Sequence, residues 1–255
     1  MSAGTASVDS RPRLYRVSAV VIRLRNLGEA DRIVSLFTRE RGKLSAVAKG
    51  VKRSRSKLAG GLQLFCHSHV QLAKGRTLEV VTQVQSADVF YHVRENLDTY
   101  FHACYVAELL SLCIEEDAPD HFLFDLLLGT LRGLNAGADA PTVVRAFELK
   151  LMTRLGYGPE VDVCVACGEA LPKGRIGFSA ARGGVVCRKC LPSTGAAPLS
   201  GAALTAMREL IGMPVSDAAQ RRLAAGPGGE LARLVRAFVD YRLDRRPESA
   251  AFLPR

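Results

Sequence analysis

The chain has 255 residues, of which 48% are hydrophobic and 24% are charged. This composition is typical of a globular protein with one large domain or two to three small ones. No apolar run reaches the ~18 residues that a membrane-spanning helix requires, and residues 1–10 lack the apolar centre of a secretory signal. We therefore expect a cytoplasmic protein with no membrane partner.

The positive charge is concentrated in one part of the chain. The formal net charge is +10. Residues 1–85 carry 16 Lys and Arg against 5 Asp and Glu, a net of +11, whereas residues 86–255 carry 19 against 20, a net of −1. Such an asymmetry indicates a separate module with its own electrostatic task, which suggests a polyanionic partner.

Residues 14–86 are predicted to form a small β-barrel, after a flexible N-terminal tail at residues 1–13. The hydrophobic pattern alternates with the period of two that places successive side chains on opposite faces of a sheet. In the first strand we expect Val20, Ile22 and Leu24 to face the core. Five short strands in about seventy residues favour the OB-fold, a barrel that often binds nucleic acid. The predicted strands are 15–25, 32–38, 43–48, 62–73 and 77–85.

A dense group of cations makes this barrel a candidate for binding DNA. Eight of them occur within nineteen residues that contain a single acid, Glu40. The segment 49–57 is expected to be a mobile loop whose cations and hydroxyls contact phosphates. A solvated charge run is the alternative. The cations are Arg39, Arg41, Lys43, Lys49, Lys52, Arg53, Arg55 and Lys57.

An aromatic platform is a second possible element of this surface. Phe65, His67 and His69 fall on the strand face opposite the predicted core, where unpaired bases could stack on them. We therefore add Phe65 and His67 to the candidate DNA-binding residues. The alternative is an exposed polar face with one stray aromatic side chain.

From Asp88 onward the apolar residues recur at three- and four-residue steps, which predicts helices. A helical domain is expected over residues 87–160 and, after the cysteine-rich segment 161–193, again over 194–255. The chain is thus α+β. Helices are predicted at 119–134, 141–155, 201–211 and 230–246, the last two separated by the breaker Gly226-Pro227-Gly228-Gly229 and preceded by a small-residue linker, 191–200.

Four of the seven cysteines have the spacing of a zinc ribbon. Two C-x-x-C pairs are separated by nineteen residues, and each pair is predicted to supply two thiolates to one tetrahedral ion. Four sulfur ligands leave no position for water, so the Zn²⁺ would be structural. Two disulfides or free thiols are the alternative. The predicted ligands are Cys164, Cys167, Cys187 and Cys190.

Three segments together resemble the RecO family of bacterial DNA-repair recombination mediators. The first is Gly28-Glu-Ala-Asp31, leading through Phe37-Thr-Arg-Glu-Arg-Gly-Lys43 to Ala48-Lys-Gly50. The second is Tyr105-Val-Ala-Glu-Leu-Leu110. The third is Phe147-Glu-Leu-Lys-Leu151 followed by Leu155-Gly-Tyr-Gly-Pro159 and Cys164-Val-Ala-Cys-Gly168. The likeness extends to Cys190 and fades beyond it.

The resemblance implies an OB-fold that binds single- and double-stranded DNA, a helical domain and a zinc module. It also implies that the protein is nucleoid-associated and not an enzyme. Members of this family anneal complementary strands, associate with RecR, recognise the acidic tail of single-strand-binding protein and help to load RecA. Such a tail needs a cation beside an apolar groove. The candidates are Arg132, Lys150 and Arg154, each equally explained as an exposed helix charge.

Two other classes of protein share some of these sequence features. Zinc modules of this spacing also occur in NAD-dependent protein deacetylases, but the chain has no glycine-rich dinucleotide loop. The cluster Glu115-Glu116-Asp117 could indicate a metal-dependent nuclease, although a solvated helix end before Pro119 explains it more simply. A protein-only scaffold remains a further alternative, which a salt titration of DNA binding would separate from the DNA-binding hypothesis.

Overall fold

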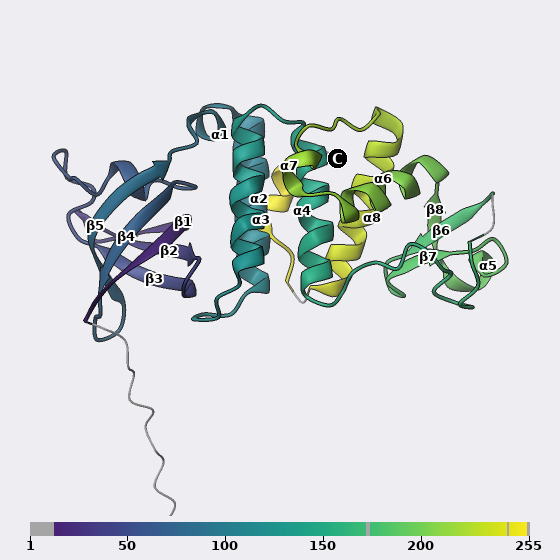
Figure 1. The fold of residues 1–255 in the computed structure, drawn as a ribbon, viewed down its shortest axis with the longest axis horizontal. Helices are drawn as coiled ribbons and strands as arrows, with labels where there is room; N and C mark the ends of the chain where they lie inside the picture. Colours follow the sequence, from purple (N-terminus) through teal and green to yellow (C-terminus); the bar gives the residue numbers. More distant parts are fainter. Residues whose placement is uncertain (1–12, 172–173, 244, 254–255) are drawn as a thin grey trace, which may run out of the picture. The chain divides into compact units, whose positions relative to one another are not determined.

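The computed structural model describes residues 13–171, 174–243 and 245–253, and the predicted tail therefore lies almost wholly outside the described residues. The chain forms two compact units (Figure 1). The first contains the N-terminal residues up to Val89 together with Glu115–Asp120, and the second contains Phe90–Ile114 and His121–Arg255. No described helix has the length and apolar character needed to cross a membrane.

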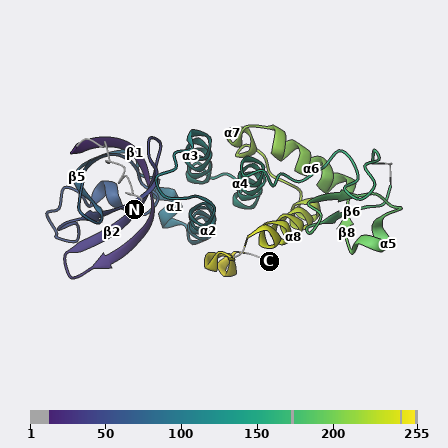
Figure 2. The same cartoon turned by 90° about the horizontal axis from the view of Figure 1, so that it is seen from below.

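The first unit is a closed five-stranded barrel, as predicted. Its strands are β1 (Leu14–Leu27), β2 (Asp31–Thr38), β3 (Gly42–Ala48), β4 (His67–Ala73) and β5 (Glu79–Asp88), in the order β1-β2-β3-β5-β4. All neighbours are antiparallel except β3 and β5, which are parallel. The parallel pair closes the sheet, and Figure 2 shows the barrel from a second side.

The first strand departs from the predicted alternation. A β-bulge between Val21 and Arg23 shifts the register of β1 against β2. Val21 and Leu24 therefore both face the barrel core, whereas Val20 and Ile22, predicted to face it, do not belong to that cluster. A bulge adds one residue to one strand and so reverses the faces that follow it. Arg23 and Arg25 point outward and are exposed.

The fourth strand begins later than predicted. Residues Gly60–Leu62 form a 3-10 turn, η1, and Phe65 has a φ of +69° before β4 starts at His67. Leu62 belongs to the barrel core cluster, but as part of this turn. The turn and the left-handed residue lead the chain into β4.

The second unit is built around a helix that is buried almost all round. Helix α4 (Ala140–Arg154) contacts α2 (Leu97–Cys113), α3 (His121–Asn135), α6 (Gly201–Gly212), α7 (Val215–Ala218) and α8 (Ala225–Arg242). Asp139 caps α4 by accepting a hydrogen bond from Thr142 N. Shorter helices lie at α1 (Tyr91–Glu95), α5 (Leu191–Thr194) and η2 (Glu248–Phe252).

Two predicted boundaries in this unit differ from the structure. Helix α8 begins at Ala225 and includes the glycine-rich segment predicted to break it. Pro227 is tolerated because it lies in the first turn, where its missing N–H would have had no partner inside the helix. The segment predicted as a linker instead forms α5 and the strand β8 (Ala197–Leu199). Strand β8 completes an antiparallel sheet with β6 (Ile176–Ser179) and β7 (Gly184–Val186), in the order β7-β6-β8.

Candidate nucleic-acid surface and metal centre

The basic segment between β3 and η1, predicted as a loop, is a series of turns whose start is tied to the barrel. Gly50 N donates to Asp31 Oδ1 at 2.7 Å, and Lys52 N donates to Ala30 O at 3.0 Å. Val51 is buried in the barrel core, which fixes the start of the segment. The hairpin turn that follows β1 and the turn that follows β3 therefore hold each other in place.

Five of the predicted DNA-binding cations are displayed by these turns. All five are exposed, and none forms an ion pair with a carboxylate of the described chain. The start of the segment is bonded to the barrel, and all five side chains are exposed to solvent, which suits binding to phosphates. They are Lys49, Lys52, Arg53, Arg55 and Lys57.

The other three predicted cations are engaged differently. Arg39, Arg41 and Lys43 are only partly exposed. Arg41 Nη2 lies 3.0 Å from Asp117 Oδ1, and Asp117 N donates to Lys43 O at 3.0 Å. The acidic segment that was expected to be a free helix end thus lies along the edge of β3. At Arg41 a phosphate would have to compete with the Asp117 carboxylate.

The predicted aromatic platform is not formed. Phe65 is fully buried, and His67 is 7% exposed. The His67 ring lies between two partners, with Nε2 at 2.8 Å from Ser18 Oγ and Nδ1 at 3.0 Å from Asp88 Oδ2. Only His69, of the three, is exposed. The pattern failed at Phe65 because its positive φ breaks the alternation before β4 begins, and at His67 because Ser18 and Asp88 enclose the ring.

Sequence reasoning missed further cations on the same unit. Arg23 and Arg25 are exposed on the outer face of β1, beyond the bulge. Arg76 is exposed in the turn between β4 and β5, and OB-folds commonly bind oligonucleotides through this turn. The alternation of Arg23 and Arg25 with Leu24 was the signal that could have identified the first two.

The three candidate partner residues have different surroundings. Lys150 Nζ donates to Ile211 O at 2.9 Å, at the end of α6, and burial lowers the pKa of this amine. Arg154 is exposed, with its guanidinium carbon 6.0 Å from the centre of the Phe122 ring. Arg132 is exposed on α3. Lys150 is therefore occupied within the helical unit, whereas the two arginines reach the surface.

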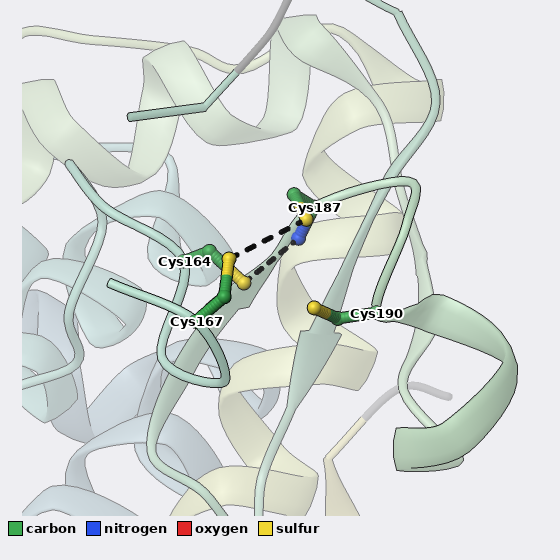
Figure 3. A group of neighbouring side chains, drawn as sticks. All are labelled: Cys164, Cys167, Cys187 and Cys190. Atoms are coloured by element: carbon green, nitrogen blue, oxygen red, sulfur yellow. Dashed lines mark hydrogen bonds between the residues drawn. The ribbon is translucent and has the colours of Figure 1, made fainter. Parts of the chain in front are cut away.

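The four predicted metal ligands converge. Their sulfur atoms lie within 4.8 Å of one another, and Figure 3 shows them pointing toward a common centre. Cys167 Sγ and Cys187 Sγ are 3.9 Å apart. A tetrahedral ion with Zn–S bonds of about 2.3 Å separates its sulfurs by about 3.8 Å. The cluster therefore has the dimensions of a four-thiolate metal site.

The acidity of the thiols also fits a bound cation. Burial opposes ionisation of Cys164, but backbone amides of Cys187, Ala166 and Cys167 donate to its sulfur and lower its pKa to about 6. By contrast, the pKa of Cys190 is raised to about 12. The largest cause is the neighbouring Cys187 thiol, and burial and the other thiols add to it. Four adjacent thiolates repel one another, so a cation is required to hold them all ionised.

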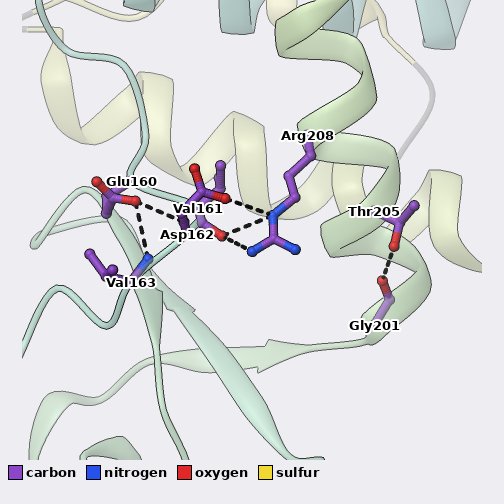
Figure 4. Close-up of polar contacts among 7 residues, drawn as sticks. All are labelled: Glu160, Val161, Asp162, Val163, Gly201, Thr205 and Arg208. Carbon is purple, nitrogen blue, oxygen red and sulfur yellow. Dashed lines mark hydrogen bonds and ion pairs between the residues drawn. The ribbon is translucent and has the colours of Figure 1, made fainter. Parts of the chain in front are cut away.

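The segment that carries the first pair of cysteines is fixed to α6. Arg208 Nη2 donates to Val161 O at 2.6 Å, and Arg208 Nε lies 3.2 Å from Asp162 Oδ1 (Figure 4). Glu160 Oε1 accepts hydrogen bonds from Asp162 N and Val163 N at 2.7 and 3.2 Å. These contacts set the direction in which the chain approaches Cys164.

Comparison with known proteins shows the family to which the chain belongs. The family model for the recombination protein O N terminal region matches residues 13–90, and that for the recombination protein O C terminal region matches residues 94–251. The chain belongs to the RecO family. The two matched regions meet close to Phe90, where the second compact unit begins.

Individual RecO proteins are similar over nearly the whole chain. The DNA repair protein RecO of Roseiflexus sp. is 40% identical over 95% of this chain and 86% of its own length. That of Symbiobacterium thermophilum is 38% identical over 94% of this chain and 96% of its own. That of Dehalococcoides mccartyi strain 195 is 31% identical, with 96% of each chain covered. The similarity thus includes the C-terminal helices, which lie beyond the sequence motifs that resemble the family.

Proposed function

We propose that this RecO protein acts in DNA repair as a recombination mediator that binds single- and double-stranded DNA through its barrel. The observation that carries the proposal is the set of five exposed, unpaired cations on the turns between β3 and η1. Phosphate contacts supply most of the affinity of sequence-independent binding. The unpaired state of these cations means that no internal carboxylate has to be displaced.

The experiment is a salt titration of binding to single-stranded oligonucleotides. Affinity should fall with salt at a log-log slope of about −0.7 per phosphate neutralised. Changing Lys52, Arg53, Arg55 and Lys57 to Gln should flatten the slope by about two to three units if each cation neutralises one phosphate. An unchanged slope would remove these turns from the site, and no affinity in the unaltered protein would favour a protein-only scaffold.

Exposed arginines that already have carboxylate partners give the matched control. Arg221 Nη2 lies 3.1 Å from Glu209 Oε2, and Arg222 Nε lies 3.1 Å from Asp139 Oδ1. Changing both arginines to Gln alters the net charge of the second unit without touching the barrel. The slope should stay the same, which separates local phosphate binding from an effect of net charge.

Strand annealing and partner binding follow from the same hypothesis. We propose that the protein anneals complementary strands, associates with RecR, binds the acidic tail of single-strand-binding protein and so helps to load RecA. Arg132 and Arg154 are the candidates for the acidic tail, because both reach the surface. An annealing assay with and without single-strand-binding protein tests this role, and the turn variant should be slower in it.

We also propose that the thiol cluster holds one structural Zn²⁺ and that the protein has no catalytic site of its own. Four sulfur ligands suit zinc and close its coordination sphere against water. The carboxylate that could have served a nuclease, Asp117, is paired with Arg41. Metal analysis should find about one equivalent of zinc. Less than half an equivalent would contradict the zinc assignment.

A further inference from the structure

At the end of α8 one arginine is surrounded by aromatic rings. The guanidinium carbon of Arg242 lies 5.8 Å from the centre of the Tyr157 ring, 5.5 Å from that of Phe238 and 5.7 Å from that of Tyr241. These are distances at which a cation is attracted to the face of a ring. We name these four residues the arginine–tyrosine cluster.

The backbone around the cluster leaves room for the guanidinium. A Cβ at Gly183 would lie 2.4 Å from Arg242 Nη2, so a side chain there would collide with the arginine. Gly183 lies in the turn between β6 and β7, beside Arg242 at the end of α8. Tyr157 is placed by a hydrogen bond from its own N to Met152 O at 2.8 Å. Two separate segments of the second unit thus form the cluster, and the turn at Gly183 borders it.

Within the cluster, Phe238 has a structural role and the two tyrosines do not. Phe238 is fully buried and packs edge-on against Phe178, with ring centres 5.8 Å apart. Tyr157 and Tyr241, by contrast, are 50% and 59% exposed. The cluster therefore has a packed base and a surface made of two aromatic rings around a cation.

The surroundings of the cluster are positive. No carboxylate of the described chain forms an ion pair with Arg242. Arg182, next to Gly183, is exposed and has no described partner either. Asp240, which precedes Tyr241, has Oδ1 3.6 Å from Arg236 Nε and Oδ2 3.4 Å from Arg246 Nε. Glu160, the nearest acid along the chain from Tyr157, has Oε1 engaged by two backbone N–H groups. A negatively charged ligand therefore meets two cations without a described carboxylate partner, while the described acids nearest in sequence are engaged by other groups.

We infer that the arginine–tyrosine cluster is a second binding site for single-stranded nucleic acid, separate from the barrel. Unpaired bases stack on aromatic and guanidinium planes, and cations beside those planes bind the phosphates. The inference rests on the proposed function and deepens it. Annealing requires two strands to be held at once, and one chain with two sites can hold both.

The test uses the full chain and short oligothymidylates that carry 5-iododeoxyuridine. Ultraviolet cross-linking of the unaltered protein should attach DNA to the peptides that contain Tyr157 and Tyr241, in addition to those of the barrel. Titration should give two oligonucleotides per chain. Changing both tyrosines to Leu should lower this to one, with a loss of about tenfold or more in affinity at the second site.

The control is an exposed tyrosine elsewhere in the same unit. Tyr91 is 64% exposed and also has an arginine over its ring, with Arg94 Cζ 5.2 Å from the ring centre. The change Tyr91→Leu should leave two oligonucleotides bound. Arg182→Gln, an exposed change that requires no repacking, should weaken only the second site.

The possible outcomes separate this inference from the proposed function. One oligonucleotide per chain, with cross-links confined to the barrel, would overturn the inference and leave the proposed function standing. No binding at all would overturn both. Binding that survives neutralisation of the barrel turns and is lost with the two tyrosines would establish the second site. Cross-linking of the unaltered protein tests for the second site without any variant, so the test remains valid even if the double variant does not fold.

Discussion

The turns of the barrel and the core of the helical unit use charge in opposite ways. On the barrel, five cations of the turns after β3 are exposed and have no described carboxylate partner. In the helical unit, the most buried charges are paired, and Arg145 Nε lies 2.9 Å from Glu148 Oε2 with both side chains almost completely buried. Unpaired surface charge costs self-repulsion and is useful for binding an anion. In a buried pair, by contrast, each charge depends on its partner, because removing one partner leaves an uncompensated charge in the core.

The comparison makes a prediction for each unit. Changes to paired or metal-bound groups of the helical unit should alter stability and leave the salt dependence of barrel binding unchanged. Changes to the unpaired cations of the barrel should alter the salt dependence and leave stability unchanged. A single residue that moved both quantities would contradict this division.

The largest effect is expected from loss of the metal. Changing Cys164 and Cys187, the two buried ligands, to Ser should abolish metal binding and unfold the segment around β6 and β7. Structural zinc contributes on the order of 10 kcal/mol to the folding of small metal-binding modules. Thermal unfolding and metal analysis would measure the loss.

The control for the metal prediction is a cysteine outside the cluster. Cys104 is half-buried on α2, and Cys104→Ser should retain the metal. The salt dependence contributed by the barrel turns should be the same in both variants. Its loss in the ligand variant alone would mean that the metal supports DNA binding directly.

The next largest effect is expected at the buried pair. Burial raises the pKa of Glu148, although Arg145 and the hydroxyl of Tyr105, which donates to Glu148 Oε1, favour its ionised form. Glu148→Gln leaves the Arg145 charge buried without its partner and should lower the free energy of unfolding by about 3–5 kcal/mol. Denaturant unfolding would measure it. Glu209→Gln, which breaks an exposed pair with Arg221, should cost less than about 1 kcal/mol.

Much of the architecture could be predicted because it depends on local patterns. The period-two pattern predicted all five strands, and the two C-x-x-C pairs predicted which sulfurs would meet. Charge counting located eight cations, and the structure leaves five of them exposed. Each of these signals is carried by residues close together in sequence, whose spacing directly sets which side chains share a face or a turn.

The failures share a cause, which is dependence on contacts between distant residues. Nothing local to Val20 and Ile22 indicates the bulge, because it is defined by pairing with β2. The acidic residue Asp117 looked like part of a helix end because its partner, Arg41, is 76 residues away. At Arg242, helix α8 itself supplies Phe238 and Tyr241, but the third ring, Tyr157, comes from a distant segment that no local pattern connects with it.

A smaller effect is expected where the acidic segment meets the barrel. Gly42 has a φ of +69°, and a Cβ there would lie 2.2 Å from Ala118 O. Gly42→Ala should therefore cost about 1–3 kcal/mol in unfolding free energy, from backbone strain and the collision together. Gly28→Ala is the control, because Gly28 has a φ of +62° and open space around it. If both variants cost the same, the contact with Ala118 contributes nothing.

The smallest effect is expected at two helix caps that differ in charge. Thr142 N and its hydroxyl donate to Asp139 Oδ2 at 3.2 and 2.6 Å, while Asn96 Oδ1 accepts from Thr99 N at 3.0 Å. Either change to Ala should cost about 1 kcal/mol at neutral pH. Burial raises the pKa of Asp139, but the Thr142 hydrogen bonds and Arg222 outweigh it and lower the pKa overall.

The two caps should therefore respond differently to acid. A carboxyl whose pKa is lowered by folding adds stability above the pKa it has in the unfolded chain, about 3.9, and that stability is lost as the pH falls through the folded value. The cost of Asp139→Ala should shrink as the pH is lowered through this range, whereas the cost of Asn96→Ala should stay constant. Unfolding curves at pH 7 and near pH 3 would measure both. Equal pH dependence would show that the charge of Asp139, despite its pairing with Arg222, adds nothing to the cap.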